Sequence, residues 1–165
     1  WKKRVGEEEA KKITTQAANR GTAVHLICEN YVLNKEDYIK NAMPTNVDAF
    51  KSLKALLDEN VDNVLGVELP LYSRVLNTAG RTDLIAEFNG VASIIDYKTS
   101  RKPKKEEWIQ NYFIQSTCYA MMFEWIYMIK IPQIAIMIAV DNETPQLFVK
   151  DKAEYIDKVF EVFTT

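Results

Sequence analysis

The sequence predicts an α/β fold of the α+β type, with a mixed β-sheet flanked by helices. Apolar residues at helical spacing fill the first third of the chain, and three strand-like segments then follow in series. Asn89-Gly90 lies between the second and third of these segments and is a strong signal for a tight hairpin. A long helical segment follows and leads to one or two more strands, so it serves as a crossover in a mixed sheet.

The first third is expected to hold two helices. Apolar residues at helical spacing mark the first one, with Gly21 as a break or a close contact: Ala10, Ile13, Ala17, Val24, Ile27, Cys28 and Tyr31. Residues 35–46, which include Pro44, are expected to form a loop. A shorter helix should then run from about residue 47 to residue 59.

The rest of the chain alternates between strand and helix signals. Strands are expected at Val64–Tyr72, Arg81–Phe88, Val91–Lys98, Ile134–Val140 and Gln146–Val149. Pro103 and the acidic pair Glu106/Glu107 are expected to open a helix that reaches about Ile129. Asp151 should cap a last helix that ends near Phe163.

Length and composition bound the class of protein. With 165 residues and no repeat, the chain is expected to be one domain over residues 1–165, with room for an upstream segment because it starts at Trp1. The net charge of −2 argues against a DNA-coating protein but says little about a local groove. No apolar stretch reaches membrane-spanning length, so no membrane association is expected.

The two cysteines, Cys28 and Cys118, lie far apart and lack the paired spacing of a zinc site. Two cysteines cannot hold an iron–sulfur cluster by themselves, so none is expected. Each falls in an apolar helical stretch and is expected to be a buried free thiol. This usage favours an intracellular, reducing compartment.

Two carboxylates and a lysine carry the strongest functional signal. Gly80-Arg81-Thr82-Asp83 opens one predicted strand, and Asp96-Tyr97-Lys98 ends the next. Side chains alternate along a strand, so Asp96 and Lys98 share a face. Two aspartates converging from neighbouring strands repel each other unless a cation lies between them, and oxygen ligands suit Mg²⁺ or Mn²⁺.

This arrangement resembles the PD-(D/E)xK nuclease superfamily, whose restriction-endonuclease-like core has the order αβββαβ. The likeness extends over roughly residues 16–140 and is stronger for the RecB-like exonuclease branch, in particular its mitochondrial genome-maintenance and phage members. The motifs that carry it are Gly21-Thr22-Ala23-Val24-His25 with Glu29, Glu68, Gly80-Arg81-Thr82-Asp83, Asp96-Tyr97-Lys98, and the pair Gln115 and Tyr119.

The resemblance implies a site that binds one or two Mg²⁺ or Mn²⁺ ions. His25, Asp83, Asp96 and the backbone carbonyl of Tyr97 are its expected metal ligands. Lys98 is expected to polarise the attacking water or to stabilise charge on the phosphate, and Glu68 to lie near the metal.

Each of these residues also has a plainer interpretation. His25, the single histidine of the chain, could be an ordinary packed helical residue. Glu29 could orient His25 or be an exposed helix charge, and Glu68 could face solvent on an edge strand, because Pro70 indicates an edge or a bulge. Lys98 could be only the salt-bridge partner of Asp96.

The resemblance also implies contacts with nucleic acid. Gln115 and Tyr119 lie one helical turn apart and share a face with Asn111, although such a stripe could also be a solvated surface. The other expected contacts are Arg20, Arg81, Thr99 and Arg101. Arg101, Lys102, Lys104 and Lys105 form a basic run that could bind anions or be a solvated loop.

The function expected from these residues is that of a metal-dependent DNA exonuclease acting on free ends of single-stranded DNA. The alternatives are a structure-specific or restriction-like endonuclease of the same superfamily, or a DNA-binding module that does not cut. The polarity of digestion, a preference for DNA over RNA, the oligomeric state and the choice between phage, cytoplasm and organelle stay open.

Overall fold

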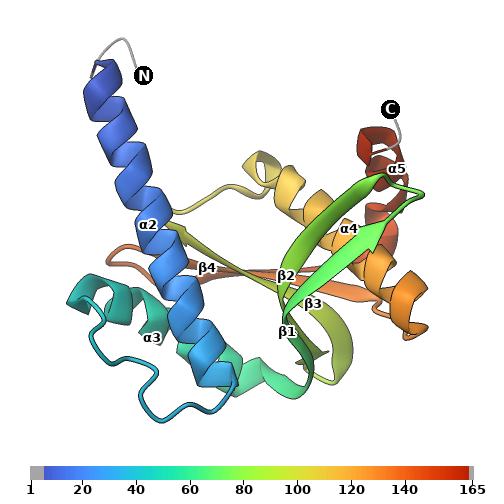
Figure 1. Ribbon diagram of the computed structural model, residues 1–165, viewed down its shortest axis with the longest axis horizontal. Helices are drawn as coiled ribbons and strands as arrows, with labels where there is room; N and C mark the ends of the chain where they lie inside the picture. The colour runs from blue at the N-terminus through green and yellow to red at the C-terminus, as the bar shows by residue number, and fades with distance from the viewer. Residues whose placement is uncertain (1–5, 164–165) are drawn as a thin grey trace.

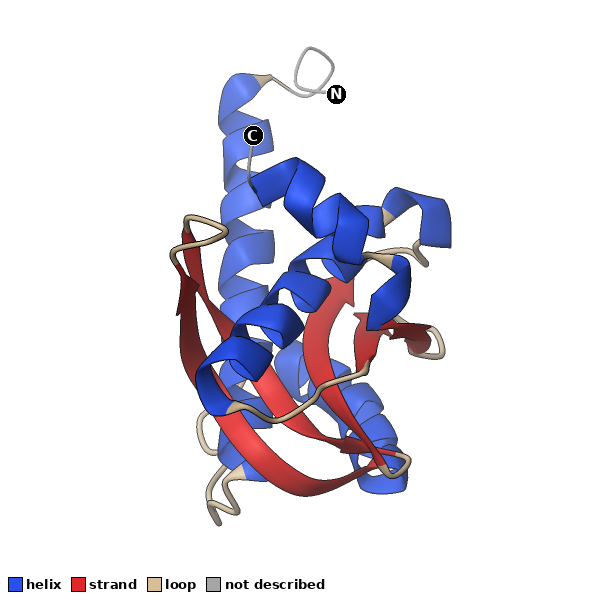
Figure 2. Ribbon diagram, turned by 90° about the vertical axis from the view of Figure 1, so that its right-hand side faces the viewer, coloured by secondary structure: helices blue, strands red, loops and turns tan. Residues whose placement is uncertain are grey.

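The computed structural model describes residues 6–163 as a sheet covered by helices on both faces (Figures 1 and 2). The elements follow one another in this order: α2 (Glu7–Val32), α3 (Pro44–Asn60), β1 (Val61–Ser73), β2 (Thr78–Phe88), β3 (Val91–Ser100), α4 (Gln110–Tyr127), β4 (Gln133–Val140), β5 (Gln146–Asp151) and α5 (Ile156–Phe163). Short 3₁₀ turns, η1 (Glu106–Trp108) and η2 (Lys152–Glu154), precede α4 and α5.

Within the described residues the sheet has five strands in the order β1-β2-β3-β4-β5. The β3–β4 pair is parallel and the other three pairs are antiparallel, which confirms the mixed sheet expected from a crossover helix. Asn89 and Gly90 link β2 to β3 with φ angles of 51° and 83°. Two positive φ angles are what a type I′ hairpin requires, so the Asn-Gly prediction is confirmed.

The two faces of the sheet bury separate cores, because alternate side chains of each strand point to opposite sides. On one face α2 and α3 cover residues such as Leu84, Ile95 and Met137. On the other face α4 and the C-terminal segment cover residues such as Ile85, Ile94 and Ile136. Figure 2 shows the sheet between α4 and α5 in front and α2 behind.

Helix α2 continues through Gly21 without a break, and its first half extends beyond the sheet (Figure 1). Gly21 does not break the helix, and its distance from β3 is an ordinary van der Waals contact that does not require glycine. A Cβ atom at this position would lie 3.9 Å from Thr99 Oγ1, so the helix crosses the end of β3 here. Val24, Ile27 and Cys28, beyond the crossing, are buried as their spacing predicts.

Several predicted boundaries are wrong, each for a local reason. Pro44 does not belong to a loop but is the first residue of α3, where its missing N–H costs nothing. Helix α4 begins only at Gln110, because the chain after Pro103 runs irregularly into η1. Asp151 does act as a cap, but its carboxylate accepts the Ala153 N–H of η2 and not an N–H of α5.

Strands β2 and β3 separate at one end, and this opening positions the candidate site. Their paired residues run from Phe88 and Val91 to Leu84 and Ile95 and stop there. Beyond this point β3 stays paired with β4 as far as Ser100. Asp83 and Asp96 are the first residues past the last β2–β3 pair, so both carboxylates lie where the two strands part.

Helix α4 approaches β2 most closely at Gly80. A Cβ atom built at Gly80 would lie 2.8 Å from Tyr119 Cε1 and 3.1 Å from its hydroxyl oxygen. Gln115 Nε2 donates a hydrogen bond to that hydroxyl at 3.0 Å. The glycine therefore makes room for the ring of Tyr119 against the sheet.

We expect Gly80→Ala to lower the free energy of unfolding by about 1–3 kcal/mol, the usual cost of overpacking. In a Tyr119→Ala background the same substitution should cost much less, because the clashing ring is gone. Urea denaturation of the four proteins in this cycle gives the coupling energy directly. Equal costs of Gly80→Ala in both backgrounds would show that Gly80 is not needed for the ring.

Candidate active site

One cluster of possible metal ligands lies at the opening between β2 and β3. A nitrogen of His25 and one carboxylate oxygen each from Asp83 and Asp96 all lie within 4.8 Å of one another. The side chains of Asp83 and Asp96 retain only 12% and 13% of their exposure, so the two charges are largely removed from water. The geometry thus brings together three side chains that the sequence predicted as ligands.

His25 reaches the cluster from α2 and is held by two hydrogen bonds. Its Nδ1 is 2.7 Å from the carbonyl oxygen of Gly21, and its Nε2 is 3.1 Å from Asp83 Oδ2. Burial disfavours its protonation, but the hydrogen bond and charge of Asp83 prevail and raise the pKa of His25 to about 9. Since the Gly21 carbonyl accepts the proton of Nδ1, a neutral His25 would present Nε2 as the free ligand atom.

Asp83 joins the two strands as well as the helix. Its Oδ2 accepts the backbone N–H of Tyr97 at 2.9 Å, a group that the separated strand β2 no longer pairs. Burial would raise the pKa of Asp83, but the hydrogen bond from His25 and the Tyr97 N–H lower it below its usual value. Asp83 is therefore ionised, and it replaces a missing rung of the β2–β3 ladder.

Asp96 is more easily protonated than Asp83. Burial and the nearby charge of Asp83 raise its pKa, although Lys98 opposes the shift. Lys98 Nζ lies 3.1 Å from Asp96 Oδ2. Within the described part of the chain this buried oxygen nevertheless has no hydrogen-bond partner of good geometry.

Lys98 shares the face of Asp96, as the strand alternation predicts. Burial disfavours its charge, but Asp96 raises the pKa of the Lys98 ammonium above its usual value. The ammonium also lies 4.5 Å from the ring centroid of Tyr112 on α4, a cation–π distance. The sequence analysis missed Tyr112, which precedes Gln115 and Tyr119 on the same helix.

Glu68 lies near the cluster without belonging to it. Its neighbours Val67 and Leu69 pair with Leu84 and Thr82, which places Glu68 opposite Asp83 on the edge strand β1. Its backbone is left-handed with φ 47°, an uncommon conformation outside glycine. Burial and the charges of Asp83 and Glu29 raise the pKa of Glu68, so Glu68 is close enough to each of these two carboxylates to be affected by its charge.

The two α4 residues of the predicted nucleic-acid surface also face this point. Gln115 donates to the Tyr119 hydroxyl, and burial raises the pKa of Tyr119 together with the charges of Asp96 and Asp83. Groups from α2 and α4, which cover opposite faces of the sheet, therefore meet where β2 and β3 part. The backbone N–H of Tyr97 donates to Asp83, while the side chain of Tyr97 is buried.

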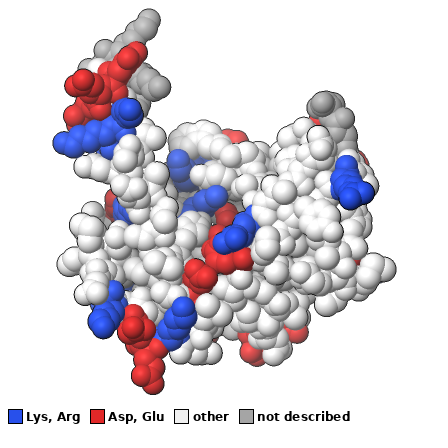
Figure 3. Space-filling view, in the orientation of Figure 1, with Lys and Arg blue, Asp and Glu red and all other residues white. Residues whose placement is uncertain are grey.

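A groove with a volume of about 1540 Å³ lies beside α2 and α3; none of His25, Asp83, Asp96 and Lys98 lines it, but it holds three of the other four residues predicted to contact DNA. Arg20, Thr99 and Arg101 line it, between α2, α3, the segment after β3 and the β4–β5 turn. Figure 3 shows basic and acidic side chains gathered in the hollow beside α2. Arg81 does not line the groove; it is exposed on β2, where its charge acts on Glu68.

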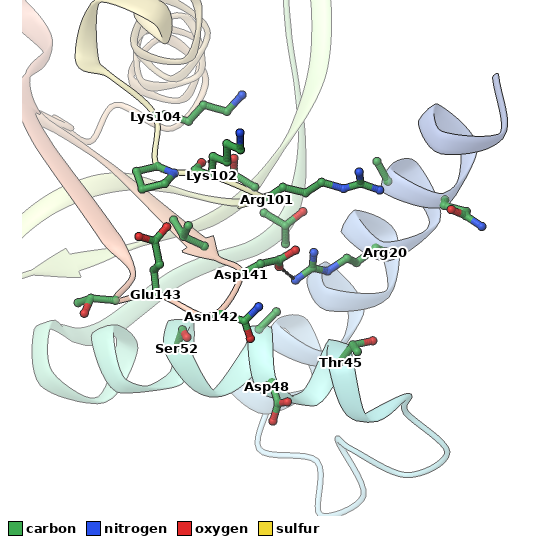
Figure 4. Close-up of a pocket in the computed structure, with 18 of the residues that line it drawn as sticks. Arg20, Thr45, Asp48, Ser52, Arg101, Lys102, Lys104, Asp141, Asn142 and Glu143 are labelled. Carbon is green, nitrogen blue, oxygen red and sulfur yellow. Dashed lines mark hydrogen bonds and ion pairs between the residues drawn. The ribbon is translucent and has the colours of Figure 1, made fainter. Parts of the chain in front are cut away.

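Arg20 is not free to the extent expected. It forms an ion pair with Asp141 of the β4–β5 turn, drawn as a dashed line in Figure 4. Its Nε atom is buried and has no hydrogen-bond partner among the described residues. Asp141 lies far away in the sequence and carried no signal that could have revealed the pair.

The donor set fits a divalent cation. Ligand atoms on opposite sides of an octahedral Mg²⁺ are about 4.2 Å apart, so donors within 4.8 Å of one another need only small movements. The unsatisfied buried Oδ2 of Asp96 and the repulsion between Asp83 and Asp96 both favour such an ion. Carboxylate oxygens and an imidazole nitrogen are both common ligands of divalent metal ions.

Two curated nucleases are similar to this chain in sequence. Human mitochondrial genome maintenance exonuclease 1 is 30% identical over 123 residues, which cover 71% of this chain and 33% of the human protein. The mouse protein of the same name is 27% identical over 108 residues, 63% of this chain and 32% of its own length. The chain thus spans about a third of the length of these curated relatives.

A solved structure supports the fold. The crystal structure of a candidate exonuclease from Eubacterium rectale superposes with a TM-score of 0.57 at 12% identity, covering 87% of this chain and 63% of that one. None of the helices in residues 6–163 is long and apolar enough to cross a membrane. A family model described as the PD-(D/E)XK nuclease superfamily matches residues 2–146, and this chain therefore belongs to that superfamily.

Proposed function

We propose that residues 1–165 form one metal-dependent deoxyribonuclease domain that hydrolyses phosphodiester bonds from free ends of single-stranded DNA. The observation that carries the proposal is the convergence of His25, Asp83 and Asp96 with Lys98 beside them. Membership of the nuclease superfamily supports the reaction class. The names of the relatives, exonucleases of mitochondrial genome maintenance, support action on DNA ends.

In this proposal His25 Nε2 and the carboxylates of Asp83 and Asp96 hold one or two Mg²⁺ or Mn²⁺ ions. When bound, such an ion lowers the pKa of a coordinated water and draws charge from the phosphate. Gly21 holds the imidazole through Nδ1, so the ring keeps its orientation during this chemistry. Glu68 and Glu29 lie outside the set of closest ligand atoms and act through their charge.

Lys98 is the proposed electrostatic catalyst. Its ammonium is held between Asp96 and the ring of Tyr112, so it needs little reorganisation when charge develops on the phosphate. The same position allows it to polarise a water molecule near Asp96. The salt bridge that the plainer interpretation foresaw is thus compatible with catalysis.

The proposed DNA surface continues from Gln115 and Tyr119 into the groove beside α2. Thr99 at the end of β3 and Arg101 just after it both line this groove, so a DNA strand that enters the groove passes these two side chains. Guanidinium groups bind phosphates through paired hydrogen bonds. We assign this role to Arg101 and also to Arg20, although Arg20 is already paired with Asp141.

The buried free thiols Cys28 and Cys118 favour a reducing compartment.

Cleavage of defined substrates tests the function. We expect end-labelled linear single-stranded DNA to be degraded with Mg²⁺ or Mn²⁺, and covalently closed circles and EDTA-treated samples to stay intact. Asp96→Asn is the matched inactive variant, because it keeps the shape of the side chain and leaves the Asp83–Tyr97 hydrogen bond in place. Cutting of circles would indicate an endonuclease, and binding without any cutting would indicate a DNA-binding module.

We expect metal binding to release protons at neutral pH. The raised pKa of His25, about 9, means that its extra proton stabilises the metal-free protein fully below pH 6.5 and ceases to do so as the pH rises through 9. A metal must displace this proton, so affinity should rise with pH over that window and then level off. Calorimetry in buffers of different ionisation enthalpy measures the release.

His25→Asn is the control for this titration. It should release about one proton fewer on binding metal at pH 7, and its residual release should come from Asp96, whose pKa is also raised. Proton release that is the same in both proteins would contradict the assignment of His25 as a ligand.

We expect Lys98→Ala to lower kcat roughly a hundredfold, the scale of losing one preorganised electrostatic group. Metal affinity should hold or increase, because a positive charge beside Asp96 has gone. Lys54→Ala is the control, since Lys54 pairs with Asp58 away from the site. Loss of metal binding together with Lys98 would make its role structural.

A further inference from the structure

An exposed tryptophan lies in the groove beside α2. Trp108 ends η1 and keeps 61% of its surface exposed, although it lines the groove together with residues of α2 and the segment after β3. Lys105 Nζ lies 5.1 Å from the ring centroid of Trp108. Single exposed aromatic side chains are common, but this ring lies in a groove lined by basic side chains.

The charges of the groove are divided between its two sides. Arg101, Lys102 and Lys104 belong to the segment that leads to Trp108, whereas acidic residues line the other side: Asp48 of α3, and Asp141 and Glu143 of the β4–β5 turn. Figure 4 shows the three basic side chains on one side of the pocket and the three carboxylates on the other. A polyanion is repelled by the acidic side and attracted to the basic one.

The ion pair of Arg20 adds to the difference in charge between the two sides of the groove. Arg20 is paired with Asp141, so the acidic side has no unpaired guanidinium to offer from α2. A phosphate backbone that enters the groove at Thr99 is therefore guided along residues 101–105. That route leads past Trp108.

We propose that Trp108 is a stacking platform for one unpaired base of the substrate, with Lys105 and its basic neighbours holding the adjacent phosphates. This inference rests on the proposed function and gives it a physical basis for single-strand preference. Phosphate contacts alone hold a duplex as well as a single strand, whereas a base can stack on a side chain only when it has left its own helix.

Trp125 provides a matched control. It is 45% exposed on α4 and does not line the groove, so it shares the chemistry of Trp108 but not the position. Binding of a fluorescein-labelled oligothymidylate is measured by anisotropy in Ca²⁺, with a gel to verify that the oligonucleotide stays intact. We expect Trp108→Ala to weaken binding about five- to a hundredfold, Trp108→Phe to weaken it less, and Trp125→Ala to bind as the unchanged protein does.

An abasic scan identifies the stacking partner. Oligonucleotides with a single abasic site at successive positions should show one position where the missing base weakens binding to the unchanged protein. At that position Trp108→Ala should be insensitive to the loss. Intrinsic tryptophan fluorescence offers a second readout. Oligonucleotide binding should quench the fluorescence of the Trp125→Phe variant, which retains Trp108. It should quench the fluorescence of the Trp108→Phe variant much less.

The outcomes separate this inference from the proposed function. Tight binding that is equal for the unchanged protein and Trp108→Ala would overturn the stacking site and leave the nuclease assignment standing. Neither binding nor cleavage of single-stranded DNA by the unchanged protein would overturn both. If Trp108→Ala lost its circular dichroism spectrum, Trp108→Phe and the abasic scan on the unchanged protein would decide the question.

Discussion

The arrangement of this site depends on the electrostatic repulsion between two neighbouring carboxylates. Asp83 and Asp96 lie past the last rung between β2 and β3, largely removed from water, where their mutual repulsion is weakly screened. The imidazolium of His25, the ammonium of Lys98 and the N–H of Tyr97 surround them and offset part of this cost. Burial and the remaining repulsion from Asp83 raise the pKa of Asp96, and such perturbations are typical of functional sites.

The separation of the strands is what allows this cluster to form. In a continuous ladder Asp83 and Asp96 would lie directly opposite each other on one face of the sheet, the face that carries Ile85 and Ile94 under α4. Where β2 and β3 part, a helix from each face can reach the same point, so α2 supplies His25 while α4 supplies Tyr112 and Tyr119. Asp83 compensates for the opening, because its carboxylate takes the place of the lost backbone acceptor of Tyr97.

Local patterns explain which features the sequence could predict. The period of two along Val91–Ser100 placed Asp96 and Lys98 on one face, and the φ preferences of Asn89-Gly90 specified the hairpin. Gly21 does not break α2, because a helical glycine costs only about 1 kcal/mol, which packing of the adjacent buried residues outweighs. The start of α4 was misplaced because Pro103 and two glutamates are an equally good opening for η1.

Long-range contacts explain what the sequence could not predict. The pairing of Arg20 with Asp141 and the stacking of Lys98 on Tyr112 depend on how separate elements meet in space. The left-handed backbone of Glu68 is likewise set by its place on the edge strand, opposite Asp83. The proposed role of Trp108 could not be predicted from the sequence, because it depends on the groove around the ring and not on neighbouring residues along the chain.

The uninterrupted α2 also has a mechanical consequence. From its crossing of β3 at Gly21, the helix extends about 21 Å to Glu7 in one direction and about 6 Å to His25 in the other, at 1.5 Å per residue. A rigid rotation of α2 about Gly21 would therefore move His25 only about a third as far as it moves Glu7. A DNA strand that displaced the outer part of α2 would therefore displace the imidazole of His25 much less.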